Sequence, residues 1–482
     1  MPGRHLLGGA MNTIRMQPPT TPLLFARLDA RLNRGRRFGI WPADLLRHTY
    51  VVGKTGGGKT TLLERLLVEQ LRAGHGLALL DPHGDLAERV LDFVPRHRQQ
   101  EVIVIEPWET ARPVGLNLLE HASIGERALV ASGVLAIFHK VFAEHWGPRL
   151  EHVFRNALLA LLEAPGTTLL GVLRLLVDER YRAGVVERLE DPLVAHFWRR
   201  EFPALPAAFR AEVLAPVQNK VSAALTSPVL RLILGQRRST VDLRAVMDSG
   251  GIVVANLAKG RIGEDASRML GAVLVTTIQL AAYRRADIAP ASRRPFTLVI
   301  DEFASFVTAS FAELLAEARK YGLALVMAHQ YLAQLDEALR AAVMGNAGTL
   351  IAFRLGADDA ERMRGEFAPE LTARDLTRLA RHQIALRLSI DGLQSPAFTA
   401  ETLAPFDEAE REGQAEVIRR ISAERYGTLR STVERDIERQ LGLRNTQEAV
   451  RSAPRARSAK VVGRESSDPA TEEPGHTMRL PL

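Results

Sequence analysis

Short apolar stretches alternate with longer amphipathic ones along much of the chain, a pattern that predicts buried parallel strands covered by helices. We expect strands at residues 49–53, 76–81 and 102–106, with helices at 59–73 and 85–93 between them. From about residue 120 to 234, leucine-rich segments broken by prolines predict helices alone. Four more strands follow, at residues 251–257, 296–301, 323–329 and 349–355. The predicted fold class is therefore α/β, a mostly parallel sheet flanked by helices and split by one helical insertion.

The two ends of the chain have different patterns. Residues 1–40 combine prolines with a basic run and predict an arm that precedes the folded body. Residues 383–399 predict a hairpin that turns at Asp391 and Gly392, and residues 406–441 predict a charged helix. The expected segments are the arm (1–40), an α/β domain in two parts (41–119 and 236–400), an all-α insertion (120–235), a C-terminal helical segment (401–450) and a disordered tail (451–482).

Composition excludes several classes of function. The chain has 482 residues, of which 46% are hydrophobic and 25% charged, as in an ordinary globular protein. Because it has no cysteine, it can form neither a disulfide framework nor a thiolate metal site. The most apolar window, residues 269–282, is shorter than the roughly 20 residues of a membrane span, so we expect no transmembrane helix and a cytoplasmic location. A net charge of +7 is too small to identify a partner.

The clearest candidate site is a glycine-rich loop after the first central strand. Residues 53–60 read GKTGGGKT, which is the phosphate-loop pattern, and a predicted helix follows. In such a loop backbone N–H groups surround phosphate oxygens, Lys59 reaches the outer phosphates, and Thr60 offers its hydroxyl to Mg²⁺. The alternative, a chance glycine-rich turn, is disfavoured by the strand and helix on either side. The expected nucleotide-binding residues are Gly53, Lys54, Thr55, Gly56, Gly57, Gly58, Lys59, Thr60 and Thr61.

Two acids end the predicted strand at residues 296–301, at the sheet edge where open α/β sheets bind ligands. We expect Asp301 to hold Mg²⁺ through water, and Glu302 to orient and deprotonate the attacking water. Paired acids after a strand often only cap a helix. The phosphate loop earlier in the chain makes the catalytic interpretation the stronger one.

Two further residues end the following strands. Gln330 comes after the strand at 323–329 and could reach the γ-phosphate; a plain surface glutamine is the alternative. Arg354 lies at the end of the next strand and could enter a neighbouring subunit's site as an arginine finger. A structural salt bridge would explain Arg354 equally well, and Arg261 and Arg268 are rival candidates for the finger.

Three polar residues, Asp81, His83 and Asp85, close the second strand beside the phosphate loop. A turn followed by a helix cap at Asp85 explains them without a function. Alternatively, Asp81 or His83 contacts the catalytic acids, and both interpretations stay open.

Aromatic and basic residues are interleaved twice in the insertion, at 146–155 and 197–200. Such residues can stack on bases and contact phosphates. Because Trp and Phe at helical spacing more often belong to a core, we favour the core interpretation.

These residues together resemble the HerA/FtsK branch of RecA-like P-loop ATPases, and within it the type IV secretion coupling ATPases of the TraG/TraD, TraM-recognition kind. The matching stretches run in order along the chain, at residues 48–60, 81–86, 146–149, 219–220, 256–260, 301–303, 317–322 and 345–354. The resemblance implies a RecA-like core with an inserted all-α domain, and ATP and Mg²⁺ bound between subunits of a homo-hexamer. It also implies DNA in a central channel, with a relaxase and type IV secretion channel components as partners.

Two departures from the family pattern keep other functions open. Coupling proteins usually carry N-terminal membrane helices, which we do not expect here, so membrane attachment would be peripheral and through partners. His83 and Asp85 stand where such proteins commonly have Lys and Glu, a form shared with HerA-like motors. The alternatives are therefore a soluble HerA-like DNA motor in repair or defence, and a nucleotide-switched adaptor that moves nothing.

Overall fold

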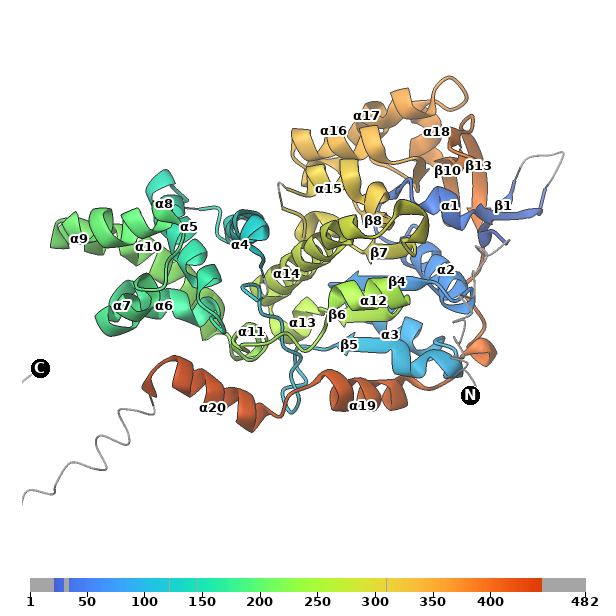
Figure 1. The fold of residues 1–482 in the computed structure, drawn as a ribbon. Helices are drawn as coiled ribbons and strands as arrows, with labels where there is room; N and C mark the ends of the chain where they lie inside the picture. Colours follow the sequence, from blue (N-terminus) through green and yellow to red (C-terminus); the bar gives the residue numbers. More distant parts are fainter. Residues whose placement is uncertain (1–20, 30–33, 121, 145, 309, 444–482) are drawn as a thin grey trace, which may run out of the picture. The chain divides into compact units, whose positions relative to one another are not determined.

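One 11-stranded sheet dominates the computed structural model, which describes residues 21–29, 34–120, 122–144, 146–308 and 310–443 (Figure 1). The spatial order of its strands is β2-β1-β13-β10-β9-β3-β8-β7-β4-β6-β5, and β11 and β12 form a separate small hairpin. The strands are β1 (Leu23–Leu28), β2 (Arg37–Ile40), β3 (Thr49–Val52), β4 (Gly76–Asp81), β5 (Val102–Ile105), β6 (Ile252–Asn256), β7 (Phe296–Ile300), β8 (Leu323–His329), β9 (Thr349–Ala352), β10 (Gln383–Arg387), β11 (Ser389–Ile390), β12 (Leu393–Gln394) and β13 (Phe398–Thr402).

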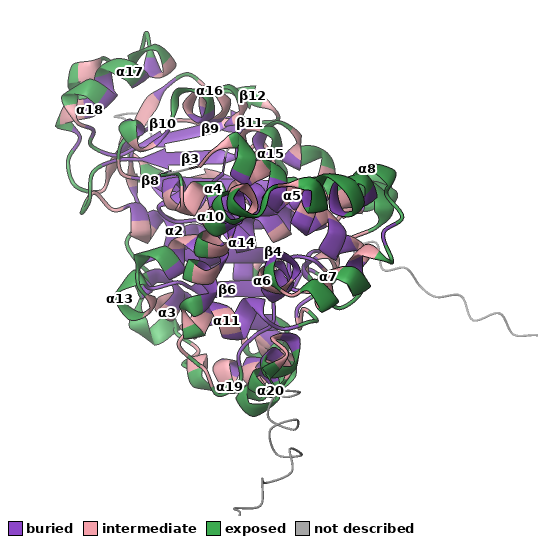
Figure 2. Ribbon diagram, turned by 90° about the vertical axis from the view of Figure 1, so that its left-hand side faces the viewer, coloured by how far each residue is buried: buried purple, intermediate pink, exposed green. Residues whose placement is uncertain are grey.

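The strands from β9 to β5 pair in parallel and form the middle and one side of the sheet. Their side chains alternate between two hydrophobic cores: Val51 belongs to one core, and its neighbours Tyr50 and Val52 belong to the other. Helices cover both faces, so the strands are buried throughout (Figure 2). All seven strands predicted from the sequence are confirmed, with ends that agree to within three residues.

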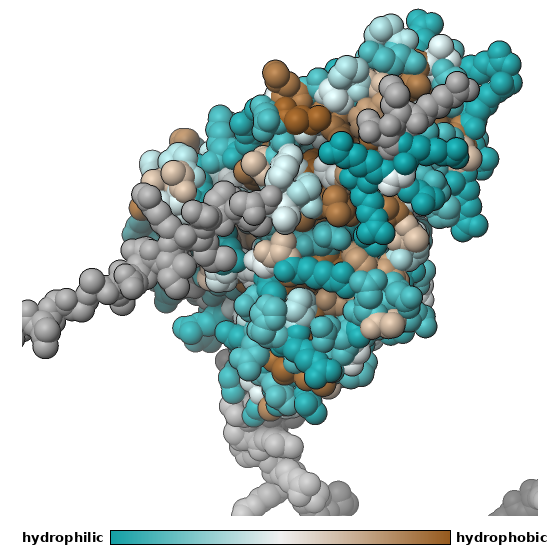
Figure 3. Space-filling model, turned by 90° about the vertical axis from the view of Figure 1, so that its right-hand side faces the viewer, coloured by the Kyte–Doolittle hydropathy of each residue, from teal (hydrophilic) through white to brown (hydrophobic). Residues whose placement is uncertain are grey.

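The helices that flank the parallel strands include α1 (Pro42–Leu45), α2 (Lys59–Arg72), α3 (Asp85–Asp92), α12 (Leu243–Ser249), α13 (Lys259–Ile262), α14 (Glu264–Tyr283), α15 (Phe311–Glu317), α16 (Glu337–Asn346), α17 (Ala357–Phe367) and α18 (Ala373–Arg378). Leu62 of α2 and Leu86 of α3 pack in the core that contains Val51, whereas Leu270 of α14 packs in the opposite one. The side of the molecule in Figure 3 is mainly hydrophilic, with its hydrophobic side chains in small separate groups.

The described residues between β5 and α12 form helices and no strands, as the leucine-rich pattern at 120–234 predicts. These helices are α4 (Arg127–Val141), α5 (Pro148–Glu163), α6 (Leu169–Val177), α7 (Glu179–Val186), α8 (Pro192–His196), α9 (Phe202–Ala204), α10 (Ala207–Thr226) and α11 (Pro228–Leu234). In the part of the chain that the structure describes, no helix combines the length and the apolar character that crossing a membrane requires.

The basic arm predicted for residues 1–40 is wrong where the structure describes it. β1 pairs antiparallel with β13, and β2 pairs antiparallel with β1, so both strands extend the sheet beyond β10 and β13. Burial explains the difference, because Leu23, Phe25 and Ala26 are in the core, and Phe25 packs edge-on against Phe38 at 5.5 Å. Residues 1–20 lie outside the described part of the chain.

The C-terminal predictions are partly correct. The hairpin turns at Asp391 and Gly392, both at positive φ, as expected. The single charged helix expected at 406–441 is wrong: the structure has two helices, α19 (Ala415–Tyr426) and α20 (Arg430–Gln440). They are separated because Gly427 pairs with Val114 and the Thr428 N–H donates to the Pro113 carbonyl, which requires extended backbone. The predicted disordered tail, 451–482, lies outside the described residues.

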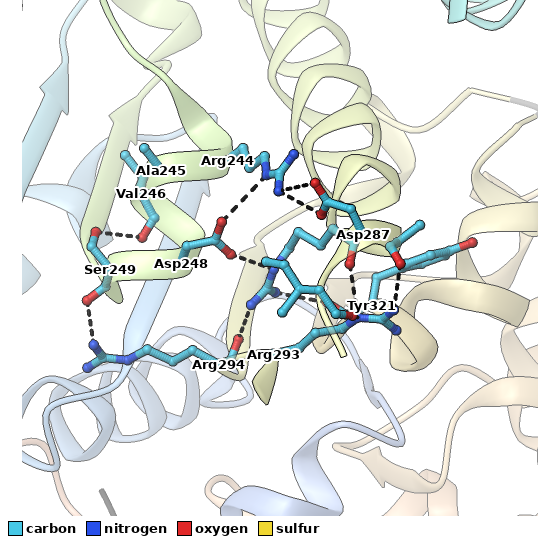
Figure 4. Close-up of polar contacts among 12 residues, drawn as sticks. Arg244, Ala245, Val246, Asp248, Ser249, Asp287, Arg293, Arg294 and Tyr321 are labelled. Carbon is cyan, nitrogen blue, oxygen red and sulfur yellow. Dashed lines mark hydrogen bonds and ion pairs between the residues drawn. The ribbon is translucent and has the colours of Figure 1, made fainter. Parts of the chain in front are cut away.

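One fully buried arginine fixes the loops at the amino ends of β7 and β8. Arg285 donates from Nε to Asp248 (2.9 Å), from Nη1 to the Tyr321 carbonyl (2.8 Å) and from Nη2 to the Arg294 carbonyl (2.7 Å). In the same network Arg244 pairs with Asp287 (Figure 4). These bonds satisfy buried charge and backbone carbonyls together, so the loops are held at one position.

Candidate active site

The candidate site lies at the carboxyl edge of the parallel strands. β3 leads into the phosphate loop, β7 leads into Asp301 and Glu302, and β8 lies between these two strands and leads into Gln330. The register aligns Val52 with His329 and with Ala352 of β9, so the residues after these three strands begin at the same level. The sheet therefore brings the phosphate loop, the acids and Gln330 together.

The phosphate loop has the backbone shape that its glycines permit. Gly56 has a φ of 77° and Gly58 a φ of 118°, which other residues rarely adopt. Lys59 folds back over the loop and donates from Nζ to the Gly53 carbonyl at 2.5 Å. Burial lowers the pKa of Lys59, while Glu302 and Asp301 act in the opposite direction. Its ammonium therefore lies between the loop and the two acids.

Asp301 and Glu302 are both buried at the end of β7. Asp301 accepts a hydrogen bond from the Glu302 N–H (3.0 Å), and Glu302 has a left-handed backbone with φ 50°. Burial, followed by the carboxylates of Asp81 and Glu302, raises the pKa of Asp301 to about 7. Asp301 thus faces two other carboxylates and one lysine, an excess of negative charge that a divalent cation would balance.

Gln330 connects the acids to the phosphate loop. Its Nε2 donates to Oε1 of Glu302 at 2.7 Å, and its Oε1 accepts from the Thr55 hydroxyl at 2.9 Å. Both ends of this amide form hydrogen bonds within the site, which a plain surface glutamine would not do. The side chain thus links β7, β8 and the loop after β3.

A buried aromatic cluster beneath the site was missed from the sequence. Tyr50 Oη and His329 Nε2 are hydrogen-bonded at 2.5 Å, and the Phe303 ring contacts both rings. Burial lowers the pKa of His329 to about 3, so the imidazole is neutral. In the sequence, Tyr50 lies just before the phosphate loop, Phe303 follows Glu302, and His329 precedes Gln330. Only the strand register brings them together, so no local signal could have found them.

Asp81 caps α3, a role that one of the two open interpretations gave to Asp85. Its carboxylate accepts from the N–H groups of His83, Leu86 and Ala87, at 2.8 to 3.0 Å. Asp85 makes no side-chain cap and is exposed. The cap prediction at Asp85 is therefore wrong, because Asp81, buried at the end of β4, reaches the helix N-terminus first. The charge of Asp81 also raises the pKa of Asp301. Asp81 can therefore both cap α3 and act on the catalytic acids.

The candidate arginine fingers lie in different environments. Arg354 is exposed beside the phosphate loop, and its carbonyl accepts from the Lys54 N–H at 3.1 Å. Within the described residues no ion pair involves its guanidinium, so the salt-bridge alternative lacks a partner there. Arg268 pairs with Glu264 on its own helix. Arg261 stacks over Trp108 at 4.5 Å, in a cavity of about 570 Å³ at the end of β5 that no phosphate-loop residue lines.

The aromatic residues of the two clusters in the insertion pack inside it or bond to its helices. Phe197 and Trp198 are buried, and Trp198 donates from Nε1 to the Asn156 carbonyl. Arg155 pairs with Glu151, which also accepts from Trp146. The core interpretation is confirmed for Phe197 and Trp198, whereas Arg149, His152, Arg199 and Arg200 are exposed.

Magnesium and a nucleotide fit the residues present. Thr60 is the first residue after Lys59 in α2, and Asp301, whose charge acts on Lys59, supplies a carboxylate. In the described residues no group of three or more His, Asp or Glu side chains could by itself hold a metal. A cation here would therefore bind with Thr60, Asp301, water and the nucleotide phosphates, as Mg²⁺ commonly does.

The sheet order, the phosphate loop and the acid pair define a RecA-like P-loop ATPase fold. The family described as "Helicase HerA, central domain" matches residues 40–137, and "TraM recognition site of TraD and TraG" matches residues 295–377. These matches confirm the predicted resemblance to HerA/FtsK-type ATPases and to coupling ATPases.

Solved structures have the same fold. "Plasmid coupling protein TrwB in complex with ADP and Mg2+" is 16% identical and has a TM-score of 0.57, with 80% of this chain and 91% of that chain covered. VirB4 of Thermoanaerobacter pseudethanolicus is 14% identical and has a TM-score of 0.57, with 81% and 99% covered. Comparison with curated proteins finds no match. At these identities the structural likeness establishes the fold alone, which is the one that the sequence predicted.

Proposed function

We propose that this chain is an ATPase of the conjugative coupling type, which hydrolyses ATP with Mg²⁺ and uses the cycle to move DNA. The observation that carries the proposal is the link from Thr55 through Gln330 to Glu302, because it joins the nucleotide loop to an acid suited to activate water. The solved TrwB structures with ADP and Mg²⁺, and with an ATP analogue, support nucleotide and magnesium as ligands.

Each site residue has a role in this proposal. The backbone N–H groups of residues 53–61 bind the phosphates, and Lys59 stabilises charge on the outer phosphates. Thr60 and Asp301 hold Mg²⁺, which when bound neutralises charge on the phosphates. Glu302 orients the attacking water and accepts its proton, since phosphoryl transfer depends mainly on positioning and electrostatics. Gln330 holds Glu302 and senses the loop that binds the γ-phosphate.

The assembly that we propose is a homo-hexamer with ATP at the subunit junctions and DNA in the central channel. Its support is the pair of family matches, together with the exposed Arg354, which is free to act on a neighbouring subunit. A relaxase and type IV secretion channel components would be the partners of such a ring, at a cytoplasmic location near the membrane. DNA contacts should be mainly to phosphates and therefore sensitive to salt.

ATP turnover, measured with and without DNA, tests the proposal. Turnover should need Mg²⁺, rise when DNA is added and collapse in Glu302→Gln while MgADP still binds; Lys59→Ala should lose binding or turnover through lost phosphate charge. A matched control is Glu361→Gln, which removes an acid exposed on α17 and should leave turnover unchanged. ATP turnover that does not change when DNA is added would instead favour the nucleotide-switched adaptor. Absence of magnesium-dependent turnover, with or without DNA, would refute the proposed ATPase activity.

A further inference from the structure

His382, immediately before β10, has an unusual backbone conformation. Its φ is 67°, in the left-handed region that a side chain disfavours. Four non-glycine residues in the described part of the chain have positive φ: His48, Glu302, His382 and Asp391. Such strain persists only where the surroundings enforce it, and it is concentrated at functional sites. Glu302 is already in the proposed active site, and His382 is beside the phosphate loop.

Three hydrogen bonds hold His382 in this conformation. Its N–H donates to the Gly57 carbonyl of the phosphate loop at 3.1 Å. Its own carbonyl accepts from the Thr402 N–H at 2.8 Å and from the Thr402 hydroxyl at 3.3 Å. The residue is therefore fixed on one side to the end of β13 and on the other to the loop that would bind phosphate.

The imidazole of His382 lies directly against Gly58. A Cβ atom placed on Gly58 would be 2.9 Å from His382 Nδ1 and 3.2 Å from Cε1 of Phe353. The two rings thus fill the space where a side chain of residue 58 would lie. Gly58 immediately precedes Lys59 and the start of α2, so its position sets the direction of the first N–H groups of that helix.

We propose that His382 is a positioning residue for the phosphate loop: its ring, together with Phe353, braces Gly58 so that the loop stays in its nucleotide-binding shape. This inference rests on the proposed nucleotide site and deepens it. This role explains why residue 382 carries a side chain despite its left-handed backbone. Glycine would adopt this backbone more easily but would leave Gly58 without the ring that contacts it. His382 acts through the loop and need not touch the nucleotide.

MgADP binding to His382→Gly, measured by calorimetry, tests the brace. Glycine keeps the left-handed backbone and its hydrogen bonds but removes the ring. We expect MgADP affinity to fall about tenfold, as when one supporting contact of a binding loop is lost. The Tm should stay within about 2 °C of wild type, because the strain relieved by glycine offsets the freedom that it gives the unfolded chain. His382→Asn, which tolerates the same backbone with a smaller side chain, should give an intermediate affinity.

Asp391→Gly is the matched control, since Asp391 is also left-handed, with φ 49°, but lies in the turn between β11 and β12. It should change the Tm as little as His382→Gly does and leave MgADP affinity at the wild-type value. Wild-type MgADP affinity in His382→Gly would overturn the brace. Weaker MgADP binding together with a large fall in Tm would also overturn it, because His382 would then support the fold as a whole. If the wild-type chain bound no MgADP, the proposed function itself would fail, and the brace with it.

Discussion

Gln330 and Glu302, which lie 28 residues apart in the chain, are joined by a hydrogen bond of 2.7 Å from Nε2 to Oε1. The same Gln330 side chain accepts from Thr55 in the phosphate loop at 2.9 Å. Because β8 lies between β3 and β7, one amide spans the two halves of the site. A displacement of the loop by a bound phosphate would therefore be transmitted directly to the proposed base.

Gln330→Ala tests this link. We expect kcat for ATP hydrolysis to fall at least about tenfold, because Glu302 loses the donor that orients it, with MgADP affinity close to wild type. Steady-state kinetics and calorimetry measure the two quantities. Gln414→Ala is the control, since among the described residues that side chain bonds to the nearby Glu412 carbonyl alone, so its loss should leave kcat unchanged. A normal kcat in Gln330→Ala would show that the link is dispensable.

Arg354→Ala tests an arginine finger acting between subunits. Turnover should fall at least about a hundredfold with MgADP affinity nearly intact, because a finger stabilises charge mainly in the transition state. Mixing Arg354→Ala with Glu302→Gln subunits should restore part of the activity, since some junctions then combine an intact acid with an intact arginine. Arg268→Ala should have little effect. Absence of recovery in the mixture argues against action in trans, and unfolding of Arg354→Ala would support a structural role.

The sequence predicted the central part of this fold well because its strands are buried on both faces. Apolar runs such as residues 102–105 are unambiguous, and the glycine-rich loop and the acid pair mark where other strands end. β1 was missed because it is short and stands next to a basic run, and because its partner β13 lies more than 350 residues away in the chain. A pairing so distant leaves no local pattern.

The sequence predicted those site residues that directly follow a strand. Lys59, Asp301, Glu302 and Gln330 followed from that placement. The Asp81 cap and the Tyr50–His329 bond depend on how far a side chain reaches and on which strands are neighbours. Both are properties of the folded sheet, so the sequence offered Asp85 as the one candidate for the cap and contained no sign of the aromatic cluster.

His48 should make the protein less stable in acid. Its Nδ1 accepts from the Leu325 N–H, so its Nε2–H donates to the Leu315 carbonyl, and burial lowers the pKa of this ring to about 4 from 6.5. Between these values the unfolded chain binds a proton that the native protein does not, so stability falls as the pH drops from 6.5 to 4. The full difference corresponds to about 3 kcal/mol.

Thermal unfolding at pH 7.5 and pH 4.5 measures this effect in wild type and in His48→Asn. Asparagine tolerates the left-handed backbone at this position, where φ is 65°, and does not titrate. The variant should start with a lower Tm, because it loses buried hydrogen bonds, but its Tm should fall less between the two pH values. His97→Asn, at an exposed histidine, should follow wild type. Equal falls in all three proteins would exclude His48 as a source of acid sensitivity.

Arg285→Leu should be strongly destabilising although it is remote from the nucleotide site. The substitution leaves Asp248 without its buried partner and leaves the Tyr321 and Arg294 carbonyls without donors, which should lower the free energy of unfolding by about 3–5 kcal/mol. Arg244→Ala, in the same network, removes pairs with the exposed Asp287 and with Asp248, which keeps Arg285, and should cost no more than about 1 kcal/mol. Urea unfolding of both variants measures the difference. Similar losses in the two variants would mean that burial of the Arg285 guanidinium adds nothing, and that the loops before β7 and β8 are held by other contacts.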